Sequence, residues 1–304
     1  MSKLPILVTF YNRPKKLEKL LLQLKFFDNI ELYFAGDGPK NQNDKKNVDK
    51  CWSLIKQHIK NENVANTLVR SQNLGCAEAM KSNLDWFFDS VAFGLILEDD
   101  CIPAPDFVNF LIQNLKVLIS FNGYMCISGF DPTKSCNTID TFRTSNFTLI
   151  WGWATWKKVW NLYKFEIFDS DDISTQYSKI IFPWYRPISR FLFKSIFTYT
   201  FNQVNRGKIE TWDYSLIASM WRNRMKSLQI NGNQIINIGF DHLATHTKKA
   251  MPKWVPVEYG KKPANNCLVS NHFELKKDQW IARKIYRINT YNFVKIQITK
   301  FLRS

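Results

Sequence analysis

The chain has 304 residues, 45% of them hydrophobic, which is enough to bury a substantial core and excludes a largely disordered protein. Its formal charge of +16 indicates anionic partners. Phosphorylated substrates, an anionic membrane surface and nucleic acid are all compatible with that charge.

The six cysteines are scattered and form no C-x-x-C pair, and no apolar run reaches the length that spans a bilayer. The first residues do not resemble a signal peptide. We therefore expect reduced thiols and a cytoplasmic protein that does not cross a membrane by a helix. Peripheral association with the inner face of the plasma membrane stays open.

The first hundred residues alternate short apolar strands with amphipathic helices, and further elements follow. Strands are expected at 6–10, 30–35, 65–70, 94–97, 124–128 and 234–240, and helices from 14, at 41–60, 76–90 and 106–119. The alternation predicts an α/β fold with a mostly parallel sheet flanked by helices. The sequence contains neither the G-x-G-x-x-G fingerprint nor a P-loop motif, so phosphate has to be held by basic side chains and metal.

An acidic run, Glu98-Asp99-Asp100, directly follows the strand expected at 94–97. In open α/β sheets, ligands bind at the carboxyl ends of strands. Adjacent carboxylates repel one another unless a cation compensates them, and an all-oxygen set favours Mg²⁺ or Mn²⁺ over zinc. A solvated acidic turn is the alternative, but the preceding apolar strand favours a divalent-metal site.

The loops after the first two strands carry further candidates. Tyr11 and Arg13 precede Pro14, which opens a helix, and an arginine at a helix N-terminus is suited to phosphate. Asp37 lies in the turn after the second strand, where it is placed to accept hydrogen bonds from a base or a ribose. The alternative interpretations are structural: Arg13 is a surface arginine, and Asp37 stabilises the turn in which it lies.

Aromatic residues are dense in the second half. Trp151 and Trp153 lie in a run interleaved with glycine and alanine, which favours either a sugar-stacking platform or core packing. Residues 179–204 are aromatic and basic, which suits an inserted lid, a membrane-touching segment or a buried helix pair. Asp213, flanked by two aromatic residues at a helix start, suits a general base with a raised pKa, or a helix cap.

Two features near the C-terminus remain open. His246 is one of two histidines four residues apart; with no third ligand nearby we reject zinc, and expect a ligand of the same divalent metal, a diphosphate contact or a structural residue. The tail from 275 to 304 carries eight Lys or Arg against one acid and repeats apolar residues at helical spacing. This predicts a basic amphipathic helix that lies on anionic lipid or packs on the body.

Seven segments together resemble bacterial nucleotide-sugar glycosyltransferases of the GT-A fold, namely ILVTFYNRP, FAGDGP, RSQNLG, LILEDDCIPAPDF, WGWATW, ETWDYS and INIGFDHLATHT. The acidic segment looks like the Glu-Asp-Asp motif of N-acetylglucosaminyltransferase I and its bacterial relatives, in a family 2-like setting. The likeness implies a GT-A (Rossmann-like) domain over 1–250, with a donor half at about 1–130, an acceptor half at about 131–250 that includes the insert 179–204, and a helical, basic C-terminal extension over 251–304.

The resemblance also implies roles for individual residues. Asp100 is the metal ligand, with His246 as a further candidate, and the cofactor is Mn²⁺ or Mg²⁺. Asp213 is the base that deprotonates an acceptor hydroxyl, which gives inversion at the anomeric carbon by direct displacement. The donor-binding residues that we expect are Tyr11, Arg13, Asp37, Arg70, Asn73, Glu98 and Asp99. The sugar platform that we expect from the aromatic residues is Trp151, Trp153 and Trp212.

The resemblance thus implies a metal-dependent inverting hexosyltransferase. Its donor is a UDP-sugar, such as UDP-GlcNAc or a similar hexose donor. Its acceptor is a hydroxyl of a surface glycan, such as lipopolysaccharide O-antigen, capsule or a lipid-linked oligosaccharide. We also expect an anionic membrane surface as a partner, and no nucleic acid.

Two alternatives come from other classes. A sugar-1-phosphate nucleotidyltransferase shares the sheet and the metal, but it should have a glycine-rich loop after the first strand, and Thr9 to Pro14 contains no glycine. A non-catalytic basic module that binds membrane or RNA explains the charge, but it does not require an acidic run at the end of a strand.

Overall fold

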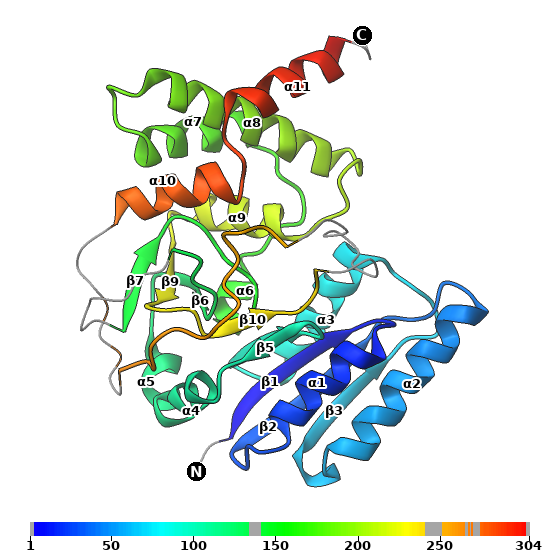
Figure 1. Ribbon diagram of the computed structural model, residues 1–304. Coiled ribbons are helices and arrows are strands. Elements are labelled where there is room, and N and C mark those ends of the chain that lie inside the picture. Colours follow the sequence, from blue (N-terminus) through cyan, green and yellow to red (C-terminus); the bar gives the residue numbers. More distant parts are fainter. Residues whose placement is uncertain are drawn as a thin grey trace.

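The computed structural model describes residues 3–133, 141–240, 251–264, 267, 269 and 274–301. Within these ranges the centre of the protein is an eight-stranded sheet with the order β3-β2-β1-β4-β8-β6-β9-β7 (Figure 1). Its strands are β1 (Leu4–Phe10), β2 (Ile30–Gly36), β3 (Val64–Val69), β4 (Phe93–Glu98), β6 (Tyr124–Ser128), β7 (Phe142–Ser145), β8 (Trp153–Trp156) and β9 (Lys226–Ile230). A separate antiparallel pair consists of β5 (Cys101–Pro103) and β10 (Ile235–Asn237).

The N-terminal half of the sheet is parallel, as predicted. β1 pairs with β2 and with β4, and β2 pairs with β3, each in parallel. β1, β2 and β4 are apolar on both faces and buried along nearly their whole length, which is typical of strands covered by helices on both sides. The predicted α/β fold, with a mostly parallel sheet flanked by helices, is therefore confirmed.

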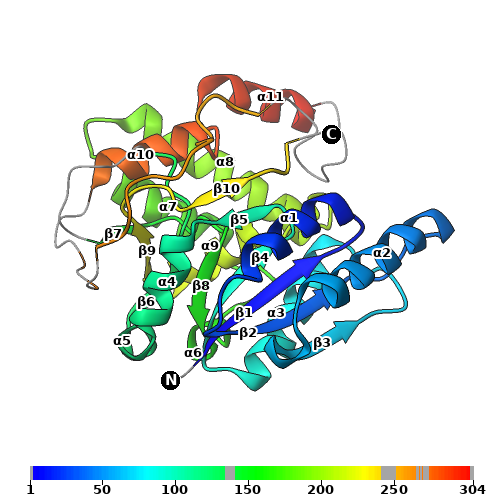
Figure 2. The same cartoon turned by 60° about the horizontal axis from the view of Figure 1, so that its bottom comes forward.

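The helices of this half lie on opposite faces of the sheet (Figure 2). The chain steps from β1 to β2 to β3 in one direction, so right-handed crossovers place α1 (Pro14–Leu24) and α2 (Gln42–His58) on one face. It then returns past β1 to β4, which places α3 (Cys76–Ser90) on the other face. The strand order therefore reverses between β1 and β4, where a crevice is expected beyond the carboxyl ends.

The C-terminal half of the sheet is mixed. The tryptophan-rich segment forms β8, which lies between β4 and β6 and runs antiparallel to both. β9 then pairs in parallel with β6 and antiparallel with β7. The sequence did not predict β7, β8 or β9, because strands of four or five residues give too short a pattern to establish a period.

Two predicted elements differ in extent from the observed ones. The helix expected at 106–119 is interrupted at Asn114 and forms α4 (Pro105–Gln113) and α5 (Leu115–Ser120). The strand expected at 234–240 is shortened to β10, because only its first residues find a partner, in β5. This short pair holds β5, which follows the acidic run, against β10.

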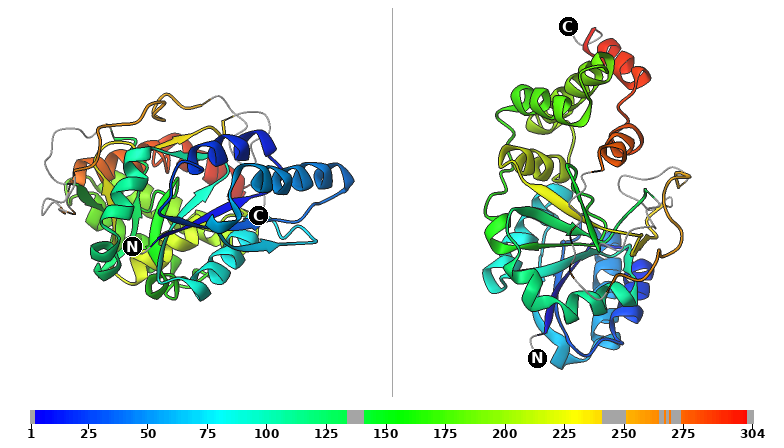
Figure 3. Two further views of the ribbon diagram at one scale, coloured as in Figure 1. Left: turned by 90° about the horizontal axis from the view of Figure 1, so that it is seen from below. Right: turned by 90° about the vertical axis from the view of Figure 1, so that its left-hand side faces the viewer.

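A layer of helices lies at the end of the molecule away from α1 and α2 (Figures 1 and 3). Besides the short α6 (Lys157–Trp160), the helices of the second half are α7 (Ser170–Ile181), α8 (Pro187–Asn205), α9 (Asp213–Arg222), α10 (Leu275–Lys284) and α11 (Thr290–Phe301). α8 packs on α7 and buries Phe193 and Phe197. The interpretation of 179–204 as a buried helix pair therefore holds for most of that segment, although the first turn of α8 is exposed.

The basic C-terminal segment begins with a helix that packs on the body. In α10, Ile281 and Ala282 are fully buried. Asp278 is also buried, and it accepts hydrogen bonds from Ser145 Oγ at 2.6 Å and from the Asn146 backbone N–H at 2.8 Å. The apolar face of α10 is therefore used inside the protein. The predicted domain boundary at residue 250 stays a prediction.

Candidate functional site

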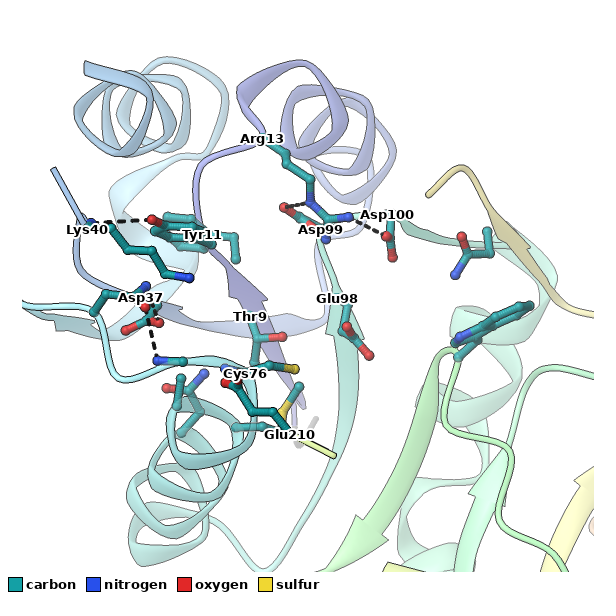
Figure 4. Close-up of a pocket in the computed structure, with 18 residues that line it drawn as sticks. Thr9, Tyr11, Arg13, Asp37, Lys40, Cys76, Glu98, Asp99, Asp100 and Glu210 are labelled. Carbon is teal, nitrogen blue, oxygen red and sulfur yellow. Dashed lines mark hydrogen bonds and ion pairs between the residues drawn. The ribbon is translucent and has the colours of Figure 1, made fainter. Parts of the chain in front are cut away.

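A cavity of about 250 Å³ opens at the point where the strand order reverses (Figure 4). It is walled by the end of β1, the loop after β2, the N-terminus of α3, the acidic run after β4 and single residues from the second half. The lining residues are Thr9, Phe10, Tyr11, Arg13, Asp37, Lys40, Asn73, Gly75, Cys76, Ala79, Met80, Asn83, Glu98, Asp99, Asp100, Trp151, Glu210 and Asn237. Most of the residues predicted to bind a donor are thus brought together.

Arg13 lies against the acidic run. Its Nε donates to Asp99 Oδ2 at 3.1 Å, its Nη2 donates to Asp99 Oδ1, and its Nη1 donates to Asp100 Oδ2 at 2.8 Å (Figure 4). Burial raises the pKa of the Asp99 carboxyl, and the charge of Arg13 offsets part of that rise. Burial lowers the pKa of Arg13, but the two carboxylates outweigh it, so the guanidinium stays charged. The carboxylates of Asp99 and Asp100 therefore hold the head group of Arg13, and its contact with phosphate stays a prediction.

Glu98, at the end of β4, lines the cavity, and its carboxyl makes no hydrogen bond or ion pair with any residue that the structure describes. Burial, and then the charge of Asp100, raise the pKa of the Glu98 carboxyl, although Arg13 lowers it in part. A half-buried carboxyl without a partner at a strand end is the arrangement that a bound cation would compensate.

Asp37 lies on the side of the cavity opposite the acidic run. Its Oδ1 accepts from the backbone N–H groups of Gly38 at 2.9 Å and Leu74 at 3.0 Å, and its Oδ2 accepts from the Asn73 side-chain amide at 2.7 Å. A carboxylate has about four acceptor positions. Asp37 therefore holds the loop before α3 in place and has about one position left for a ligand.

Tyr11 and Lys40 form the rim beside Asp37. The Tyr11 hydroxyl donates to Asp44 Oδ2 at 2.5 Å and accepts from the Lys40 backbone N–H at 3.4 Å. Burial and the Asp44 carboxylate raise the pKa of Tyr11, so this hydroxyl stays protonated. The Lys40 side chain is exposed and makes no ion pair within the described ranges. The Lys40 ammonium group is thus available to an anionic ligand at this rim.

Glu210 is a cavity residue that the sequence did not single out. Its Oε1 accepts from the backbone N–H of Cys76, the first residue of α3, at 2.7 Å, and its side chain is otherwise exposed. Gly75 has a φ of 82°, and a Cβ there would lie 2.4 Å from Glu210 Oε1. The sequence did offer one indication of Glu210: it is an acidic residue three positions before Asp213, the residue predicted to be a general base.

The cavity also contains the thiol of Cys76. Burial, and then the charges of Glu98 and Glu210, raise the pKa of this thiol to about 12. Because the thiolate is the nucleophilic form, Cys76 does not serve as a nucleophile near neutral pH. The site is thus one of carboxylates and cations.

Only one of the three predicted platform tryptophans reaches the cavity. Trp151 lines it and is backed by Trp254, whose ring is stacked at 6.4 Å. Trp153 and Trp212 stack on each other at 5.6 Å and are 1% and 3% exposed. The prediction of a sugar platform is therefore wrong for these two residues, because large apolar rings at β8 and before α9 are buried in the core.

Three other predicted residues lie elsewhere. Arg70 stands behind the wall, where it donates to Asn83 Oδ1 at 2.7 Å and to Ser82 Oγ at 2.9 Å. Asp213 begins α9 and accepts from Thr211 Oγ1 and from the Tyr214 backbone N–H. It is not a lining residue, but its charge contributes to the raised pKa of Glu98. His246 lies outside the described residues.

A divalent cation fits the oxygen ligands at the acidic run. Asp100 and Glu98 line the cavity, and the side-chain oxygen of Asn237 lies beside Asp100, since a Cβ at Gly239 would lie 2.2 Å from Asp100 Oδ2 and 2.9 Å from Asn237 Oδ1. The part of the chain that the structure describes contains no cluster of three or more His, Cys, Asp or Glu arranged to hold a metal. Mg²⁺ bound together with substrate phosphates needs only one or two carboxylates, so these residues suffice.

Comparisons with known proteins give no argument about this chain. Neither the comparison with protein-family models nor that with curated proteins gives a match. Among solved structures, the chain is similar to the mannosyltransferase PcManGT from Pyrobaculum calidifontis in complex with GDP-Man and Mn²⁺, with a TM-score of 0.39 and 13% identity over 72% of this chain and 69% of that one. So distant a likeness carries no argument, and the site is interpreted from its own residues.

Replacing Gly75 with Ala should lower the free energy of unfolding by about 2–3 kcal/mol, because alanine is strained at this positive φ and its Cβ displaces Glu210. Gly123 is the matched control: its φ is 81° and a Cβ there meets nothing within 4 Å. Gly123→Ala should cost only the backbone strain, about 1 kcal/mol. Denaturant unfolding measures both free energies. If the two variants lose the same free energy of unfolding, the displacement of Glu210 by the added Cβ contributes nothing to the loss.

Proposed function

We propose that this chain is a metal-dependent glycosyltransferase that uses a nucleotide-sugar donor. The observation that carries the proposal is a single cavity with Asp37 on one side and the acidic run on the other, at the reversal of strand order (Figure 4). A nucleoside diphosphate needs hydrogen-bond acceptors at one end and charge compensation at the other. The resemblance of the sequence to GT-A glycosyltransferases supports the same assignment.

A uridine nucleotide is the donor we propose. Asp37 has about one acceptor position left after its three internal hydrogen bonds, and uracil presents a single ring N–H donor. Guanine presents more donors along the corresponding edge. Asn73 and Tyr11 flank this end of the cavity and position the nucleoside.

The diphosphate then lies towards the acidic run. Asp100 and Glu98 would hold Mn²⁺ or Mg²⁺, which when bound supplies compensation for the charge of the departing diphosphate. Arg13 keeps Asp99 and Asp100 in one orientation, and Lys40 and the N-terminus of α3 favour the phosphate anions. Trp151 offers its ring to the transferred sugar.

The acceptor hydroxyl needs a base on the far side of the sugar. We propose Asp213 for this role, in an inverting displacement, because its carboxylate is near enough to influence both Glu98 and Cys76. Glu210 is the second candidate, since it lines the cavity and is exposed. The acceptor we propose is a hydroxyl of a surface glycan, of the lipopolysaccharide, capsule or lipid-linked kind.

Calorimetric titration with UDP tests the proposal directly. Wild-type protein should bind UDP in the presence of Mn²⁺, and Asp100→Ala should weaken that binding by about tenfold or more, because a ligand of the cation is lost. Asp106→Ala is the control, since Asp106 is an exposed carboxylate just beyond the acidic run. If wild-type protein binds no nucleoside diphosphate with metal, the proposal fails and a basic binding module takes its place.

The affinity for metal should depend on pH. Because burial, and then the charge of Asp100, raise the pKa of Glu98 to about 8, the carboxyl holds a proton over most of the range from about pH 5 to about pH 8, and a cation has to displace that proton. Affinity for Mn²⁺ should therefore rise with pH across this range, with proton release that calorimetry detects in buffers of different ionisation enthalpy. Glu98→Gln should flatten the pH dependence; an unchanged slope in this variant would exclude Glu98 as its source.

The base is identified by comparing two isosteric variants. Asp213→Asn should reduce the rate of sugar transfer by about 10²–10⁴ while leaving UDP affinity nearly unchanged, because a base acts on the acceptor and not on the nucleotide. Glu210→Gln retains an oxygen that accepts the Cys76 N–H, so it should lower the rate much less. The reverse order of the two effects would transfer the role to Glu210.

A further inference from the structure

The turn between α7 and α8 exposes an unusual concentration of large apolar side chains. Trp184 is 79% exposed, Tyr185 is 64% exposed and Ile188 is 73% exposed. Phe191, one turn further along α8, is also exposed. We call these four residues the α7–α8 patch.

The part of the patch on α8 lies on a helix that packs against α7 and α11. Ile188 and Phe191 are three residues apart and lie on one face of α8, whereas Phe193 and Phe197 on the opposite side of the helix are buried. The Phe191 ring contacts Phe293 of α11 at 5.2 Å. An exposed apolar surface of this kind on ordered helices marks an interaction site more often than a chance feature.

Two arginines without acidic partners among the described residues lie near the patch. Arg186 lies in the turn itself, and Arg283 of α10 lies over the Phe182 ring at 5.6 Å. Burial, and then the nearby charge of Arg186, lower the pKa of Arg283. Neither arginine forms an ion pair with another described residue. Two like charges held together without compensation favour an anionic surface.

We propose that the α7–α8 patch docks this protein on an anionic lipid bilayer, with Trp184, Tyr185 and Ile188 in the interfacial region and Arg186 and Arg283 on lipid phosphates. Tryptophan and tyrosine have an apolar ring and a polar edge, which suits the boundary between headgroups and acyl chains. Ile188 and Phe191 add apolar area, which is buried favourably among acyl chains but gains little from contact with nucleic acid. None of the described helices combines the length and the apolar composition of a bilayer-spanning segment.

Cosedimentation of the full chain with vesicles tests this surface. Wild-type protein should bind vesicles that contain phosphatidylglycerol more tightly than vesicles of phosphatidylcholine alone, and added salt should weaken the binding. The double variant Trp184→Ser with Ile188→Ser should reduce the partition coefficient by about tenfold or more, because two large apolar side chains no longer insert. Arg186→Gln with Arg283→Gln should remove the preference for phosphatidylglycerol.

Phe26→Ser is the matched control, since Phe26 is an aromatic residue that is 76% exposed at a distant place, after α1. Its vesicle binding should equal that of wild type, and the thermal unfolding midpoint should confirm that every variant is folded. Unchanged vesicle binding in the Trp184 and Ile188 double variant would overturn the proposal. Two other results would also overturn it. One is a dimer of the wild-type protein, detected by light scattering, that the double variant does not form. The other is binding of labelled RNA, without vesicle binding, that the double variant loses.

Discussion

The compensation of three consecutive carboxylates at the end of a buried strand is the constraint on which the candidate site depends. Arg13 provides part of this compensation, because it reaches from the loop after β1 to both Asp99 and Asp100. The Asp99 carboxylate is almost inaccessible, and breaking such a buried pair typically costs about 3–5 kcal/mol. The same contact ties together the ends of β1 and β4, the two strands on either side of the reversal in strand order.

Compensation by Arg13 is incomplete, and that incompleteness makes the site suitable for a ligand. Glu98 faces the cavity without a partner among the described residues, and burial disfavours its charged form. Asp100 lines the same cavity, and the side-chain oxygen of Asn237 lies beside Asp100. The protein therefore already holds the ligands in place, and the remaining negative charge favours a cation that arrives with an anionic substrate.

The second half of the chain closes the cavity and provides its own surface. The short β5–β10 pair brings Asn237 beside the acidic run, and Glu210 crosses to the N-terminus of α3. The same half forms the helical layer that carries the α7–α8 patch, at the end of the molecule away from α1 and α2 (Figures 1 and 3). A protein docked by this patch would therefore contact lipid through the half that contributes Asp213 and Glu210, which suits an acceptor presented at a membrane.

The sequence by itself determined the parallel half of the fold and the position of the acidic run. Apolar strands, amphipathic helices and a carboxylate cluster at a strand end are local patterns, and their period and order are enough to predict them. Only the tertiary structure decided which side chains meet. Arg13 pairs with residues more than 80 positions away, and Glu210 caps a helix 134 positions away.

The sequence could not show which of the three tryptophans reaches the cavity, for the same reason. Composition made Trp151, Trp153 and Trp212 equivalent. In the structure, Trp153 in the fully buried strand β8 stacks on Trp212 in the core, and Trp151 is left at the cavity. Burial depends on which elements cover a residue. No pattern within a short window of sequence contains that information, because the covering elements come from distant parts of the chain.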